Sequence, residues 1–266
     1  MIVPERRAAG LGWASPPPAP ALFAIPGSKP PWQKDDTVAD FGTQRLNMVE
    51  SQVRPSDVTD RHLMRAMLDL PREAFVPEWA RAVAYADDDL AVSRARPGQP
   101  ARFLLAPRIL AKLIQAAELQ AGDRVLDVGC ATGYSTAVLA RLAHDVVGLE
   151  ESPELAAAAR LALQSAGLQS AGLANARIEQ GVLARGWTAA GPYDVIVLNG
   201  SVPDLPGALL QQLKEGGRLV GIVAGQGTFG TAQLRIRRGA AFASRTLFDA
   251  GAPRLPGVEA AASFAF

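Results

Sequence analysis

Short apolar runs alternate with segments of helical periodicity through the second half of the chain. The run at 193–199 is continuous, as in strands buried on both faces of a sheet, and Gly216 and Gly217 are predicted to end the helical pattern that follows it over 205–213. The predicted strands are residues 125–127, 145–150, 176–180, 193–199 and 218–223, with an antiparallel edge from 232–237 and 241–248. This order predicts an α/β protein with a doubly wound, mostly parallel seven-stranded sheet.

The N-terminal part of the chain has a different character. Residues 1–40 are repeatedly interrupted by proline and show no amphipathic period, which predicts a disordered tail or a start codon placed too far upstream. Residues 41–118 carry helical patterns and an apolar loop at 103–107, and we predict an N-terminal helical cap there. Residues 119–266 are predicted to form the ligand-binding domain.

A turn of small residues follows the first predicted strand. It reads GCATGY from Gly129 to Tyr134 and leads into a helical pattern of alanine and leucine. Gly129 and Gly133 permit positive φ and a close ligand approach, and the following helix offers unpaired N–H groups. Ala131 lies in the middle of the turn, where glycine-rich loops of this kind have glycine, and its methyl group is tolerated if φ there is negative. A strand, a glycine-rich turn and a helix in this order are typical of nucleotide-binding βαβ units.

Acidic residues end the first two strands of this unit. Asp127 is expected to point toward the position of a dinucleotide pyrophosphate, which disfavours an anionic ligand and a nicotinamide-dependent reductase. Glu150 ends the next run about twenty residues after the loop, where a carboxylate can accept hydrogen bonds from both ribose hydroxyls. S-adenosylmethionine carries a ribose, an ammonium group and a positive sulfur, so we expect it to be the cofactor.

Composition excludes several classes of function. A formal net charge of +1 gives no reason to expect nucleic acid or an anionic membrane as a partner. One cysteine and two histidines exclude a disulfide framework, a cysteine-rich zinc site and a His-centred triad, which favours a cytoplasmic protein without a metal. No apolar run is long enough for a membrane span. The acidic cluster at 87–89 is interpreted as a solvated loop.

Several motifs outside the glycine-rich loop are shared with one family. They are 71–77 (PREAFVP), 84–90 (AYADDDL), 191–194 (GPYD) and 211–220 (QQLKEGGRLV). With them the chain resembles the protein-L-isoaspartate O-methyltransferase family, within the class I S-adenosylmethionine-dependent methyltransferases, from about residue 45 to about residue 225. The first motif is the most specific, because generic methyltransferases have no such connector ahead of the cofactor loop.

The resemblance implies a Rossmann-like methyltransferase fold and a defined reaction. A methyl group would pass from S-adenosylmethionine to the side-chain carboxylate of isoaspartyl residues in damaged proteins or peptides, which starts their repair. The methyl donor is already activated and the carboxylate is ionised near neutral pH, so such an enzyme chiefly aligns the two and excludes water. The scarcity of histidine is compatible with this chemistry, because it needs no strong base.

The implied substrate loop departs from the family pattern Gly-Gln-Thr-Ile-Ser-Gln-Pro. Aligned on Pro107, the sequence has Phe103 at the threonine position and Leu105 at the position of the active-site serine. Arg102 is expected either to pair with an anionic substrate or to face solvent. These changes leave two alternatives open: a methyltransferase with another acceptor, such as an apolar small molecule or a modified peptide, and a non-catalytic cofactor-binding relative.

The segment after the third strand also departs from the family, which has Gly-Asp-Gly there. Val182 replaces the aspartate that reaches the adenine amino group, so a backbone carbonyl would have to accept that hydrogen bond. Tyr134 is expected either to pack or to line the pocket, and Cys130 to be a passive small residue. The expected cofactor-binding residues are Asp127, Gly129, Cys130, Ala131, Gly133, Tyr134, Glu150, Glu151, Gly181, Val182 and Asn199.

Overall fold

The computed structural model describes residues 40–165, 173–225 and 227–258. The tail predicted for residues 1–40 therefore lies almost entirely outside the described residues. Within the described ranges, no helix is both long enough and apolar enough to cross a membrane.

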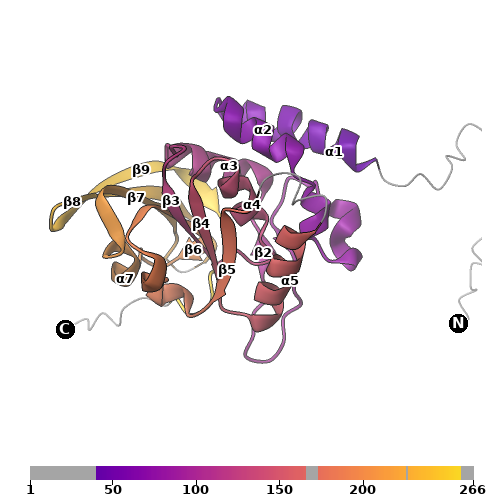
Figure 1. The fold of residues 1–266 in the computed structure, drawn as a ribbon. Coiled ribbons are helices and arrows are strands. Elements are labelled where there is room, and N and C mark those ends of the chain that lie inside the picture. The colour runs from indigo at the N-terminus through magenta and orange to yellow at the C-terminus, as the bar shows by residue number, and fades with distance from the viewer. Residues whose placement is uncertain (1–39, 166–172, 226, 259–266) are drawn as a thin grey trace, which may run out of the picture. The chain divides into compact units, whose positions relative to one another are not determined.

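One seven-stranded sheet forms the centre of the fold, in the order β5-β4-β3-β6-β7-β8-β9 (Figure 1). Strands β3 to β7 run parallel, and β8 and β9 are antiparallel to their neighbours. Their bounds are Arg124–Val128 (β3), Asp145–Glu150 (β4), Ala176–Gln180 (β5), Tyr193–Val202 (β6), Leu213–Val223 (β7), Phe229–Arg238 (β8) and Ala241–Gly251 (β9). This confirms the predicted α/β fold and its antiparallel edge. Because β3 lies between β4 and β6, the sheet has its switch point at the carboxyl end of β3.

Alternate residues of the parallel strands enter two separate hydrophobic clusters, one on each face of the sheet. In β3, Val125 belongs to one cluster and Leu126 to the other, and Val195 and Ile196 of β6 divide in the same way. The first cluster also contains residues of the N-terminal helices, and the second contains residues from the segments that follow β5 and β6. Burial on both faces explains why these strands appear in the sequence as continuous apolar runs.

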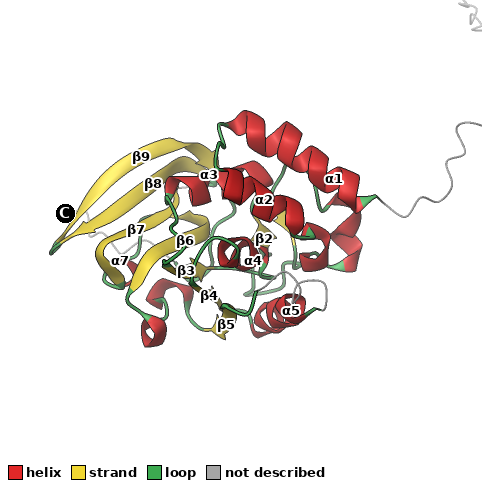
Figure 2. Ribbon diagram, turned by 45° about the horizontal axis from the view of Figure 1, so that its top comes forward, coloured by secondary structure: helices red, strands yellow, loops and turns green. Residues whose placement is uncertain are grey.

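The helices cover the sheet, and those within residues 41–118 form the predicted N-terminal cap. Their bounds are Phe41–Met48 (α1), Arg61–Asp69 (α2), Pro107–Ala116 (α3), Tyr134–Ala140 (α4), Pro153–Gln164 (α5) and Gly207–Leu210 (α7). Helices α1 and α2 lie together beside α3 and α4 (Figure 2). The Asp60 side chain caps α2 by accepting hydrogen bonds from the backbone N–H groups of His62 and Leu63, which fixes where the buried face of this helix begins.

The helix predicted over 205–213 is wrong in length. Only Gly207–Leu210 is helical, and β7 already begins at Leu213, which pairs with Tyr193. Gly216 has a φ of 74° and lies with Gly217 in an irregular part of β7, where the register against β6 shifts. A strand bulge needs the same conformational freedom as a helix C-terminus, so the glycine pair could not distinguish the two.

Two short strands connect the cap to the loop ahead of the sheet. Leu90–Ala91 (β1) pairs antiparallel with Phe103–Leu104 (β2), so part of the apolar loop predicted at 103–107 is extended and hydrogen-bonded. The backbone N–H of Ala106 donates to Asp89 at 2.8 Å, and Arg108 pairs with Asp87. The acidic cluster at 87–89 thus fixes this loop, and in the described part of the chain no group of His, Cys, Asp and Glu could hold a metal ion.

Candidate active site

The glycine-rich turn joins the carboxyl end of β3 to α4 at the switch point of the sheet. Gly129 and Gly133 have φ values of 76° and 93°, as expected. Ala131 has a φ of 51°, so the negative φ that would make its methyl group easy to tolerate is not the one it adopts. The left-handed conformation costs a residue with a Cβ roughly 1–2 kcal/mol. Here it lets the Ala131 N–H donate to Glu150 Oε2 at 2.9 Å, so a strong hydrogen bond to a carboxylate offsets the strain.

Asp127 fixes this turn from within the fold. Its carboxylate is fully buried and accepts hydrogen bonds from Ser135 Oγ at 2.7 Å, Thr136 Oγ1 at 2.6 Å and Asn199 Nδ2. The side chain therefore connects β3, α4 and β6, instead of extending into a ligand space as the sequence analysis expected. Burial raises the pKa of the Asp127 carboxyl to about 6, although the hydrogen bonds from Thr136, Ser135 and Asn199 lower it.

Replacing Asp127 with asparagine is expected to change how stability depends on pH. The folded protein binds this proton more tightly than the unfolded chain does, so Asp127 adds stability as the pH falls toward 4 and loses that contribution as the pH rises through about 6. Between about pH 7 and about pH 4.5, the unaltered protein should gain about 2 kcal/mol that D127N does not gain. Urea unfolding at both pH values measures the difference, and identical pH profiles would contradict the assignment.

Glu150 is the most heavily hydrogen-bonded carboxylate of the site. It is fully buried at the end of β4. Oε1 accepts from the backbone N–H groups of Glu151 at 3.0 Å and Ser152 at 3.1 Å, and Oε2 accepts from Ala131 N at 2.9 Å and Arg102 Nη2 at 2.9 Å. A carboxylate offers about four lone-pair positions, so all of them are used.

Arg102 occupies a position that neither alternative anticipated. Its side chain is buried and forms an ion pair with Glu150, so the solvent-facing interpretation was wrong. Nη2 also donates to the Gly129 carbonyl oxygen at 3.1 Å, which holds the guanidinium against the glycine-rich turn. Nε is buried without a hydrogen-bond partner. The structure thus places a cation from the predicted substrate loop on the carboxylate predicted to bind ribose.

Leu255 is a residue of this site that no sequence signal indicated. It is buried, and its backbone N–H donates to the Ser201 carbonyl oxygen at 2.9 Å, which holds the segment after β9 beside the end of β6. A Cβ added to Gly129 would lie 2.6 Å from Leu255 Cδ2, and one added to Gly200 would lie 2.8 Å from Leu255 Cγ. Leu255 therefore packs directly over the glycines at the ends of β3 and β6.

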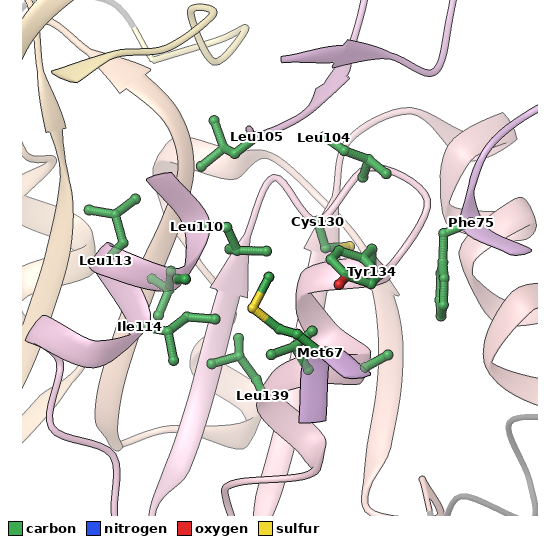
Figure 3. Close-up of a cluster of buried hydrophobic side chains, with 14 of the residues drawn as sticks. Met67, Phe75, Leu104, Leu105, Leu110, Leu113, Ile114, Cys130, Tyr134 and Leu139 are labelled. Carbon is green, nitrogen blue, oxygen red and sulfur yellow. The ribbon is translucent and has the colours of Figure 1, made fainter. Parts of the chain in front are cut away.

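The predicted substrate loop is partly core. Leu105, at the position of the expected serine, is buried in a cluster with the cap and α3 (Figure 3). Phe103 is only half-buried. The fully buried Arg72 holds this loop, since Nη2 donates to the Leu105 carbonyl oxygen at 3.0 Å and Nε to the Ala84 carbonyl oxygen at 2.9 Å. The Leu105 side chain accordingly has a packing role.

The remaining predicted residues divide between the core and the surface. Tyr134 packs edge-on against Phe75 at 5.6 Å between ring centroids and lies beneath the Arg72 guanidinium, as the packing interpretation expected. Cys130 is buried, and burial raises the pKa of its thiol well above the ordinary value. Val182 follows β5 and is 42% exposed. Figure 3 shows Cys130 and Tyr134 in one cluster with Leu104 and Leu110.

A cavity of about 720 Å³ opens beside Glu150. Its walls come from the cap, the segment ahead of β2, the start of α5 and the segment after β9, including Trp79, Gln99, Arg102, Glu151, Ser152 and Gly257. A second, much smaller cavity of about 10 Å³ lies between Leu105, Gly129, Cys130 and Asn199. The larger cavity gives access to Glu150, and the glycine-rich turn itself is covered by Arg102 and Leu255.

The sheet order, the glycine-rich turn and the acid at the end of β4 define a Rossmann-like methyltransferase. The chain matches the family model of protein-L-isoaspartate(D-aspartate) O-methyltransferase (PCMT) over residues 44–242, and it belongs to that family. It is 39% identical over 198 residues to protein-L-isoaspartate O-methyltransferase 1 of Rhodopseudomonas palustris (strain HaA2), covering 74% of this chain and 76% of that protein. Protein-L-isoaspartate O-methyltransferase 2 of Pelobacter propionicus is 37% identical over 195 residues, covering 73% and 81%.

Solved structures share the fold at lower sequence identity. A protein-L-isoaspartate O-methyltransferase structure has a TM-score of 0.67 and 22% identity, covering 82% of this chain and 67% of its own. A Plasmodium falciparum structure (PCMT) in complex with S-adenosyl-L-homocysteine has a TM-score of 0.67 and 21% identity, covering 80% and 98%. At these identities the structures establish the fold alone.

Proposed function

We propose that this protein transfers the methyl group of S-adenosylmethionine to the side-chain carboxylate of isoaspartyl residues in proteins or peptides. The observation that carries the proposal is the family match over residues 44–242, which includes the connector at 71–77, the glycine-rich turn and Glu150. The single cysteine, buried and unpaired, favours the reducing cytoplasm as the site of this activity.

The residues of the site fit the chemistry of this cofactor. Glu150 is a buried carboxylate suited to accept hydrogen bonds from a ribose diol. Gly129 and Gly133 adopt a left-handed backbone and carry no side chain, so the turn is open to a close ligand approach at these positions. Space is the constraint, because Arg102 and Leu255 pack against Gly129 in this arrangement. Cofactor binding therefore requires these two side chains to move, while Asp127 keeps the turn itself in place.

The reaction makes modest demands on the protein. S-adenosylmethionine supplies an activated methyl group, and the acceptor carboxylate is ionised near neutral pH. The chain's own contribution is alignment and exclusion of water, which the buried Leu104, Leu105 and Tyr134 provide around the turn. Arg72 fixes the backbone of the loop through the Leu105 carbonyl oxygen, so this wall stays in position.

A second candidate function rests on Leu105. Leucine has no hydroxyl, so the loop lacks one at the position where the family pattern has serine. The Leu105 side chain is instead buried in the core. A methyltransferase of the same fold acting on a different, less polar acceptor would suit such a wall. This alternative shares the cofactor with the first proposal and differs only in the acceptor.

Methyl transfer to a synthetic isoaspartyl peptide tests the proposal directly. The full chain is incubated with methyl-labelled S-adenosylmethionine and the peptide, and the matched peptide with ordinary aspartate is the control. Methylation of the isoaspartyl peptide alone, over many turnovers, is the expected result. Calorimetric binding of S-adenosylhomocysteine without transfer would favour another acceptor, and the absence of binding would indicate a non-catalytic relative.

A further inference from the structure

Arg102 and Glu150 cannot keep their present pairing when a ribose binds to Glu150. Four donors already fill the lone-pair positions of this carboxylate, so an incoming hydroxyl must replace one of them. Three of the four are backbone N–H groups of the turn and of the start of α5, and they can leave only if these segments rearrange. The Arg102 guanidinium is the one donor on a flexible side chain, so it is the donor that is exchanged.

A displaced Arg102 needs a new anionic partner close to the glycine-rich turn. In the described part of the chain, Arg72 and Arg102 are the two buried arginines, and Arg72 is held by the Ala84 and Leu105 carbonyl oxygens. Arg102 is tethered at β2, contacts the Gly129 carbonyl oxygen and lines the 720 Å³ cavity. An unpaired buried guanidinium is strongly unfavourable, so an anion entering through this cavity would be bound tightly.

We propose that Arg102 exchanges one carboxylate for another, leaving Glu150 when the cofactor binds and then pairing with the carboxylate of the methyl acceptor. This inference rests on the proposed function, because it takes the acceptor to be a carboxylate. It gives the substrate loop the polar group that Phe103 and Leu105 do not provide. It also makes acceptor affinity depend on the bound cofactor, since the cation is released only after the ribose has taken its place.

The exchange is tested with Arg102→Met. The variant removes the pair that the cofactor must break, so the Kd of S-adenosylhomocysteine measured by calorimetry should fall at least roughly tenfold. The KM of the isoaspartyl peptide should rise roughly tenfold or more, with a smaller change in kcat. In the unaltered protein, peptide binding should be detectable with S-adenosylhomocysteine present and much weaker without it, and R102M should lose this dependence.

Arg218→Met is the matched control. It removes the same atoms from a largely buried pair with Asp123, at the opposite end of β3, and should leave both constants unchanged. Arg102→Gln replaces R102M if the methionine variant does not fold. Unchanged or weaker cofactor binding by R102M, or an unchanged KM for the peptide, overturns the exchange. Failure of the unaltered protein to methylate the peptide overturns the proposed function, and with it the acceptor half of the exchange, whereas the calorimetry still tests release from Glu150.

Discussion

Replacing Glu150 with glutamine should destabilise the protein by about 3–5 kcal/mol and abolish tight cofactor binding. The substitution keeps the size of the side chain but replaces one acceptor oxygen with an N–H₂ group. That group would face either the N–H groups of Glu151 and Ser152 or those of Ala131 and Arg102, so two donors lose their acceptor whichever way the amide points. Arg102 then remains buried without a counter-ion.

Urea unfolding and calorimetric titration with S-adenosylhomocysteine measure the two effects separately. The double variant E150Q/R102M should regain part of the lost stability, because it removes the unpaired guanidinium, and should not regain binding. Glu179→Gln is the control: this residue lies on β5 with its side chain 31% exposed, in a loose pair with Arg177. A stability loss below about 1 kcal/mol for E150Q would contradict a buried, fully used carboxylate.

Replacing Gly129 with alanine should cost about 2–5 kcal/mol of stability. A φ of 76° is unfavourable for any residue with a Cβ, by roughly 1–2 kcal/mol. The added Cβ would also lie 2.6 Å from Leu255 Cδ2 and 3.1 Å from Arg102 Nη2, and overpacking of this kind typically costs about 1–3 kcal/mol. Both effects act on the turn that would hold the cofactor, so G129A should also weaken cofactor binding.

A double-mutant cycle separates the two causes. In a Leu255→Ala background the steric conflict is relieved, and G129A should then cost only the roughly 1–2 kcal/mol of the backbone strain. Gly207→Ala is the control, because an added Cβ at this position meets no atom within 4 Å, and it should change stability by less than about 0.5 kcal/mol. Equal costs of G129A in both backgrounds would show that Leu255 does not pack on the turn.

The sequence was sufficient to predict the features of this fold that are encoded locally. The apolar runs gave the parallel strands, with β4 and β5 at their observed bounds, and the spacing from the turn to Glu150 located the buried carboxylate. The glycines of the turn have the positive φ that their position required. Each of these signals depends on neighbouring residues, so one sequence contains it completely.

The features that could not be predicted depend on contacts between distant residues. Arg102 meets Glu150 across 48 positions of the chain, and nothing in the apolar stretch around Arg102 indicates that it is buried. Leu255 reaches the turn from beyond β9, after the end of the matched family region. Ala131 is left-handed because Glu150 accepts its N–H, so its φ also depends on a residue elsewhere in the chain.

The central position of β3 has a consequence for how this protein matures during synthesis. The turn after β3 requires β4 for Glu150 and β6 for Asn199, and the cavity beside Glu150 takes Gly257 from the segment after β9, so a nascent chain lacking its last strands cannot form the complete site. Such long-range pairing forms late and slowly compared with local contacts. The cofactor therefore cannot assist early folding. It stabilises only the completed molecule, by mass action, and thereby protects finished chains selectively.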